Sequence, residues 1–133
     1  MREILFRGKR MDNGEWVEGY YAPIGKYHYI LTGRLELVPY LGFEHFLVNP
    51  DTVGQFTGLT DKNGVKIFEG DIVRYGDTIH RVVFEQRNGT AYFGLVYAAC
   101  ETLPFGHYQD LKQIEVIGNI YDNPELLEVN ESD

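Results

Sequence analysis

Few side chains in this sequence have the type and spacing that catalysis needs. Glu69 and Asp71 stand two residues apart, so on a strand they share one face, and paired carboxylates can act as acid and base. The same pair fits a turn, because Asp71 follows Gly70 and can accept hydrogen bonds from local backbone amides. Cys100 follows an apolar run, which favours a buried, inert thiol. The only serine, Ser132, lies at the chain end, so we expect no serine nucleophile in the folded body.

Metal and nucleotide sites are not indicated either. No histidine has another histidine or a cysteine within four positions, the spacing of most structural zinc sites. Residues 61–64 begin like a calcium loop, but the glycine at position 6 and the glutamate at position 12 of such a loop are missing. Neither glycine-rich phosphate-binding pattern occurs. We expect no metal, no cofactor and no catalytic residue, although an acid–base role for Glu69 and Asp71 stays open.

Aromatic residues are the most suggestive feature. The chain has 10 Tyr, 8 Phe and one Trp. Tyr and Trp combine a large apolar face with a polar tip, which suits interfaces and stacking sites. Trp16, Tyr20, Tyr27 and Tyr29 could form one aromatic surface, which would stack bases or sugars or bury against another subunit. Ordinary packing in a β-core is the reading that the β-propensity of aromatic residues favours.

The charge is unevenly distributed along the chain. The formal net charge is -8, but residues 1–100 carry -1 and residues 101–133 carry -7. The first ten residues contain Arg2, Arg7, Lys9 and Arg10 against Glu3. The overall charge argues against a simple binder of phosphate backbones, yet the near-neutral body leaves nucleic acid open as a partner.

Three Asn-Gly pairs predict hairpins, because both residues tolerate the positive φ of tight turns. They are Asn13-Gly14, Asn63-Gly64 and Asn88-Gly89. The flanking strand-like runs are residues 3–9 and 15–22, 54–59 and 65–69, and 79–86 and 90–98. Further strands are expected at residues 27–31 and 114–120. Residues 82–84 and 92–97 are nearly continuous apolar runs, typical of strands covered on both faces.

Helix is scarce in this prediction. Residues 38–48 could form a short helix that a proline and a glycine weaken, and residues 124–129 fit a capped C-terminal helix. Residues 69–77 are similar to small SH3-like barrels, in which a Gly-Asp turn leads into a strand. We therefore expect a mainly β fold, hairpin-rich, with an SH3-like small barrel or roll, additional N-terminal strands and a short C-terminal helix. A single domain over residues 1–133 is expected, with a possible seam near 61–64.

The sequence contains neither a predicted membrane span nor a signal region, and this bears on the expected cellular location. No stretch approaches the ~18 apolar residues of a membrane span, and the N-terminus has no apolar signal region. We expect a cytoplasmic protein that makes no contact with a membrane.

Three segments together resemble a known family. They read ILFRGKR at 4–10 with GEWVEGY at 14–20, NPDTVGQFTGLTDKNG at 49–64 with IFEGDIV at 67–73, and VIGNIYDNPEL at 116–126. This set resembles the YopX family of bacteriophage and prophage proteins over essentially the whole chain. The resemblance implies a β-rich fold with an SH3-like roll, a phage or prophage origin and residence in the bacterial cytoplasm. It supplies no activity.

Within the middle segment, Gln55 and Thr57 are candidate binding residues, since on a strand they point to one side and Phe56 to the other. The alternative is that the glycines around them serve bulges and a turn.

The sequence favours a non-enzymatic interaction module of a phage that self-associates. A nucleic-acid-binding small barrel is the second reading, with the N-terminal cations and aromatic rings serving single strands. An enzyme using Glu69 and Asp71 is the third. An inhibitor that mimics an acidic partner of a host protein through the acidic C-terminal segment is the fourth. A host or phage protein is the remaining candidate partner.

Overall fold

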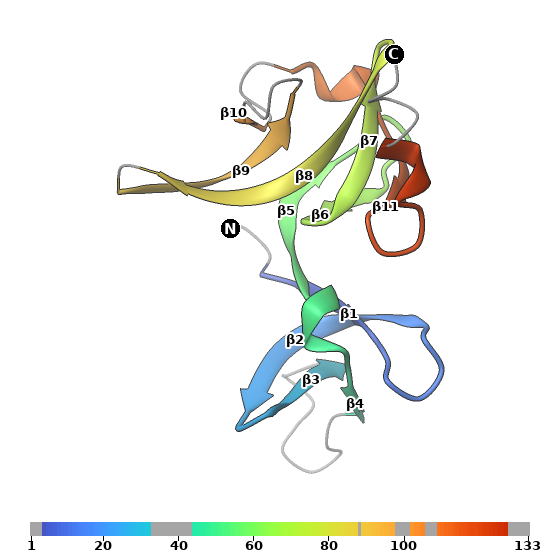
Figure 1. Cartoon of the computed structure of the whole chain (residues 1–133), viewed down its shortest axis with the longest axis vertical. Coiled ribbons are helices and arrows are strands. Elements are labelled where there is room, and N and C mark those ends of the chain that lie inside the picture. Colours follow the sequence, from blue (N-terminus) through green and yellow to red (C-terminus); the bar gives the residue numbers. More distant parts are fainter. Residues whose placement is uncertain (1–3, 33–43, 88, 98–101, 106–108, 128–133) are drawn as a thin grey trace. The chain divides into compact units, whose positions relative to one another are not determined.

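The computed structural model describes residues 4–32, 44–87, 89–97, 102–105 and 109–127. The chain divides into two compact units, Met1–Phe56 and Thr57–Asp133. Both are built from antiparallel strands (Figure 1). The mainly β prediction is therefore confirmed, whereas the expectation of one domain with a seam near residues 61–64 stays a prediction.

The first unit is an open sheet in the order β4-β3-β2-β1-β5. Its elements are β1 (Phe6–Lys9), β2 (Trp16–Ile24), β3 (Tyr27–Thr32), β4 (Glu44–Leu47), the short 3₁₀ helix η2 (Pro50–Thr52) and β5 (Gly54–Thr60). Strand β5 pairs with β1 through Gly54 and Gln55 and continues into the second unit, where it pairs with β6.

The second unit contains a five-stranded sheet in the order β10-β9-β8-β7-β11, with a long β8–β9 hairpin (Figure 1). Its elements are β6 (Lys66–Phe68), β7 (Asp71–Tyr75), β8 (Thr78–Arg87), β9 (Thr90–Val96), β10 (Thr102–Pro104), the 3₁₀ helix η4 (Leu111–Gln113) and β11 (Ile114–Asn119). No sheet of the described residues closes on itself, so the SH3-like barrel is not confirmed.

The strands flanking each Asn-Gly pair form hairpins: β1 with β2, β5 with β6, and β8 with β9. Gly14, Gly64 and Gly89 have φ values of 73°, 81° and 78°, the left-handed region that glycine adopts without steric cost. Asn13 Oδ1 accepts a hydrogen bond from the amide of Glu15 at 2.9 Å. Asn88 lies outside the described residues.

Two elements differ from the sequence-based expectation. The helix predicted for residues 38–48 is wrong over its last part, because Glu44–Leu47 pairs with β3 as a strand; residues 38–43 lie outside the described chain. The run 82–84 is not covered on both faces, since Phe84 is 41% exposed and packs edge-on against Phe93 across the hairpin. Residues 125–127 are helical, which confirms the short C-terminal helix.

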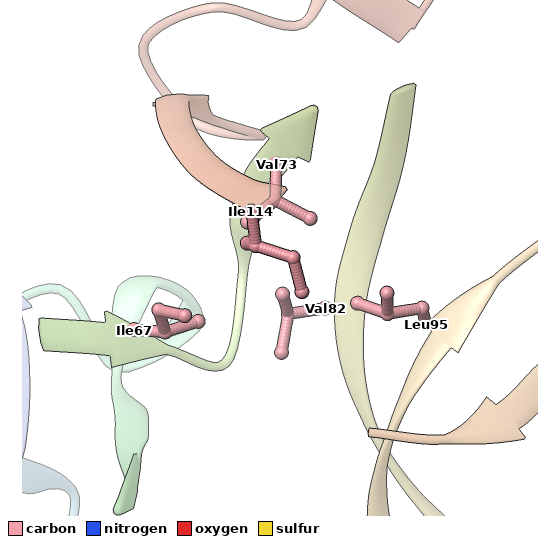
Figure 2. Packing of buried hydrophobic residues seen from close by; sticks show 5 residues of the cluster. All are labelled: Ile67, Val73, Val82, Leu95 and Ile114. Carbon is pink, nitrogen blue, oxygen red and sulfur yellow. The ribbon is translucent and has the colours of Figure 1, made fainter. Parts of the chain in front are cut away.

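The core of the second unit is a cluster of five branched aliphatic side chains with 0–1% exposure (Figure 2). They are Ile67, Val73, Val82, Leu95 and Ile114. They come from five different strands, so burying this cluster fixes the strands against one another. Each such side chain contributes about 1.5–3 kcal/mol on burial.

Asp61 joins segments far apart in the sequence. Its Oδ1 accepts hydrogen bonds from the amides of Asn63 and Val65 in the β5–β6 turn, at 2.8 and 2.9 Å. Its Oδ2 accepts one from the amide of Val116 on β11, at 2.9 Å. Burial acts to raise the pKa of Asp61, but these three amides outweigh burial and hold the pKa below its usual value of 3.8.

We predict that Asp61→Ala lowers the free energy of unfolding by about 2–4 kcal/mol, because three amides lose a charged acceptor. Asp61→Asn removes the charge and turns one acceptor into a donor, so it also destabilises. Because the folded pKa is depressed, the contribution of Asp61 is present above pH 3.8 and is lost as pH falls through the folded pKa.

Urea denaturation measures these changes. Asp77→Ala is the control, since Asp77 is exposed in the β7–β8 turn and should change stability by no more than about 0.5 kcal/mol. If Asp61→Ala lowers the free energy of unfolding by no more than the control does, the proposed role of the three Asp61 hydrogen bonds is contradicted.

His80 is a second buried titratable group, 4% exposed and 4.2 Å from the ring of Tyr97. Its Nδ1 donates to the carbonyl oxygen of Val96 at 2.9 Å, and its Nε2 lies 2.7 Å from the hydroxyl of Thr78. Burial lowers the pKa of His80 below its usual 6.5, although the bond to Val96 acts in the opposite direction.

We expect stability to fall as pH drops below about 6.5, because the unfolded chain binds a proton there that folded His80 resists. Unfolding curves between roughly pH 8 and pH 5 measure this slope. His80→Gln should flatten it, because the variant has no imidazole at this position to take up the proton. A slope that survives His80→Gln would overturn the assignment.

Candidate functional site

The strand register of the first unit places the four predicted aromatic residues on one side of its sheet. On β2, Trp16 and Tyr20 lie on the same face because side chains alternate along a strand. On β3, Tyr29 is opposite Ala22 and Tyr27 is opposite Ile24, which continue that face. Directly paired residues share a face. The structure therefore brings together the residues that the sequence proposed as one surface.

We call this side of the sheet the aromatic face. It consists of Arg7, Lys9, Trp16, Glu18, Tyr20, Ala22, Ile24, Tyr27, Tyr29, Leu31, His45 and Leu47. Much of its apolar surface is open: Tyr20 is 40% exposed, Ile24 63%, Tyr27 49% and Leu47 38%.

The opposite side of this sheet is the buried one. Ile30 and Val48 are 0% and 1% exposed. A side chain at Gly8 would lie 3.1 Å from Val48, and one at Gly19 would lie 2.1 Å from the carbonyl oxygen of Leu31, so both positions are closed to larger residues. The fully buried side chains of this sheet therefore lie on that side, and the exposed apolar ones lie on the aromatic face.

A hollow of about 300 Å³ lies on the aromatic face. It is lined by Ala22, Ile24, Tyr27, Tyr29, Leu31 and His45. The rings of Tyr29 and His45 meet edge-on with their centroids 5.8 Å apart. We call the part of the face around this hollow its apolar end, defined by Ile24, Tyr27, Tyr29 and Leu47.

Two cations lie against the ring of Trp16 at the other end of the face. The guanidinium of Arg7 lies 4.6 Å from the centre of the Trp16 ring, and the ammonium of Lys9 lies 5.7 Å from it. This geometry is a cation–π cluster. We call Arg7, Lys9, Trp16 and Tyr20 the cationic end. Lys26 lies 5.4 Å from the ring of Tyr27 at the opposite end of β2.

Arg10, the next cation along the chain, is paired with Asp12. Its guanidinium makes two hydrogen bonds to the carboxylate of Asp12, at 3.0 and 2.7 Å. The hydrogen bond raises the pKa of Arg10 and lowers that of Asp12. Arg10 also lies 4.4 Å from the ring of Phe46.

Gln55 and Thr57 have different surroundings. Gln55 is half-buried in β5 opposite Phe6 of β1. Thr57 is 7% exposed; its hydroxyl donates to the carbonyl oxygen of Ile67 at 2.8 Å and accepts from the amide of Leu59 at 3.2 Å. The hydroxyl of Thr57 therefore serves the β5–β6 pairing.

Asp71 also serves the backbone. It is 1% exposed, and its Oδ2 accepts a hydrogen bond from the amide of Phe68 at 2.7 Å, which closes the turn between β6 and β7. Glu69 is half-buried in the same turn. The hollow on the aromatic face is not lined by either carboxylate. Among the residues that the structure describes, no group of three His, Cys, Asp or Glu could hold a metal ion.

Some members of the aromatic face were missed by the sequence analysis. Ile24 could have been found by extending the alternation of β2 from Tyr20. His45 and Leu47 could not, because they join the face only through the register between β3 and β4.

Comparison with known proteins identifies a similar solved structure and a matching family. The crystal structure of protein EF1440 from Enterococcus faecalis is similar, with a TM-score of 0.53 and 26% sequence identity over 96% of this chain and 99% of that one. No curated protein sequence matches the chain. Over the described ranges, the helices are too short or too polar to cross a bilayer. The family profile described as YopX protein matches residues 5–128, so the chain belongs to the YopX family.

Proposed function

We propose that this protein is a non-enzymatic interaction module that self-associates through the apolar end of its aromatic face. The observation that carries the proposal is the exposure of Ile24, Tyr27 and Leu47, at 63%, 49% and 38%, on one face of a sheet. Exposed apolar side chains gathered in this way mark interaction surfaces more often than single ones do. A second copy offers the same apolar chemistry in return.

The lack of charge among the residues that define the apolar end supports a contact with the same surface of a second copy. The defining residues of this end, Ile24, Tyr27, Tyr29 and Leu47, are apolar or aromatic, and Lys26 packs on the ring of Tyr27. Two such surfaces can meet without burying an unpaired charge, which would cost several kcal/mol. Tyrosine is favoured at interface centres for its large, rigid contact area.

The proposal also covers the origin of the protein and its cellular compartment. The resemblance to phage and prophage proteins supports an accessory protein of phage or prophage origin that acts in the bacterial cytoplasm. A host or phage protein that covers the apolar end in place of a second copy is the competing occupant.

We predict that the double variant Ile24→Ser/Leu47→Ser weakens self-association at least about tenfold, because each buried aliphatic side chain contributes about 1.5–3 kcal/mol. Light scattering coupled to size-exclusion chromatography, over a range of concentrations, gives the mass. Phe84→Ser is the matched control, since Phe84 is 41% exposed on a strand of the second unit. Wild-type protein with the mass of one chain at every concentration would refute self-association.

A further inference from the structure

We infer that the cationic end of the aromatic face binds single-stranded nucleic acid, with Arg7 and Lys9 contacting phosphates and the rings of Trp16 and Tyr20 contacting bases. This site goes beyond the proposed self-association, because it uses the other end of the face. The first observation is the placement of both cations on the Trp16 ring, at 4.6 and 5.7 Å.

Charge complementarity selects an anion as the partner. The chain as a whole carries -8, yet this end presents two cations against one acid, Glu18. Two copies meeting face to face at this end would bring like charges together, so a second copy does not fit here.

The aromatic rings favour single-stranded nucleic acid over other anionic partners. Tyr20 is 40% exposed and lies on the same face as Glu18, the residue opposite Arg7, and Trp16 is half-buried with its ring against both cations. Flat sheets with exposed aromatic rings stack unpaired bases, and arginine planes stack bases as well. Duplex bases are already stacked on one another. An acidic peptide would satisfy the cations but would leave the rings unused.

The negative charge of the whole chain sets the expected strength. Repulsion from a net charge of -8 opposes a polyanion, so binding should be measurable at low salt and should fall as salt rises. Two phosphate contacts predict a slope of log K against log salt of about -1.4 on a single strand, at about 0.7 for each contact.

The test uses the fluorescence of Trp16, which is the only tryptophan in the chain and so reports on this site alone. The full chain is titrated with unlabelled oligothymidylate of about a dozen nucleotides. We expect saturable quenching with the salt slope above, and a slope of about -0.7 for Lys9→Gln. Tyr20→Ser should weaken binding roughly 5- to 150-fold, whereas Tyr20→Phe keeps the ring and should bind like the wild type.

Matched variants tell binding at this end of the face from binding elsewhere on the chain. Lys112→Gln removes an exposed cation of the second unit and should leave the slope unchanged. The inference would be overturned if quenching were absent or independent of salt. It would also be overturned if Lys112→Gln reduced quenching as much as Lys9→Gln does. An equal response to polyglutamate would assign the site to an acidic protein segment instead. Ile24→Ser/Leu47→Ser should keep oligonucleotide binding while losing self-association. Lys9→Gln should keep self-association while weakening oligonucleotide binding and lowering its salt slope, so the two proposals can fail separately.

Discussion

The alternation of side chains across one sheet is the constraint on which the candidate site depends. In the first unit, each cross-strand pair commits both partners to the same side. Ile30 and Val48 occupy the buried side, and the tight approach at Gly19 leaves no room there for anything larger. Tyr20, one position away, must therefore face outward. Shifting the β2–β3 register by one residue would bury the aromatic face and expose the core.

In the second unit, a single carboxylate has a comparable role. Asp61 holds the β5–β6 turn with one oxygen and β11 with the other, so a local turn and a contact between residues 55 positions apart depend on one side chain. The amide of Lys62 adds a bond to the carbonyl oxygen of Ile114, 2.9 Å long, beside it. Ile114 belongs to the aliphatic cluster, so this polar clamp and the core hold the same strand.

Local signals carried most of what the sequence could predict. Hairpins followed from Asn-Gly pairs because a positive φ is a property of the residue itself. The common face of Trp16 and Tyr20 followed from alternation within one strand. The strand at Glu44–Leu47, and with it Leu47 on the aromatic face, depends on pairing with β3, which no local pattern encodes. The link from Asp61 to Val116 was hidden for the same reason.

The segments that resemble the YopX family divide by role once they are placed in the structure. In the middle and C-terminal segments, polar side chains bond to the backbone: Thr57 to Ile67, Asp61 to Val116, and Asn119 Oδ1 to the amide of Tyr121. Such residues explain a shared fold without a shared reaction. The N-terminal segment differs, because it places Arg7, Lys9 and Trp16 together on one face of the sheet, with both cations against the indole ring. Of the segments that resemble the family, only the N-terminal one contributes side chains to the proposed nucleic-acid contacts, whereas the hydroxyl of Thr57 serves the β5–β6 pairing.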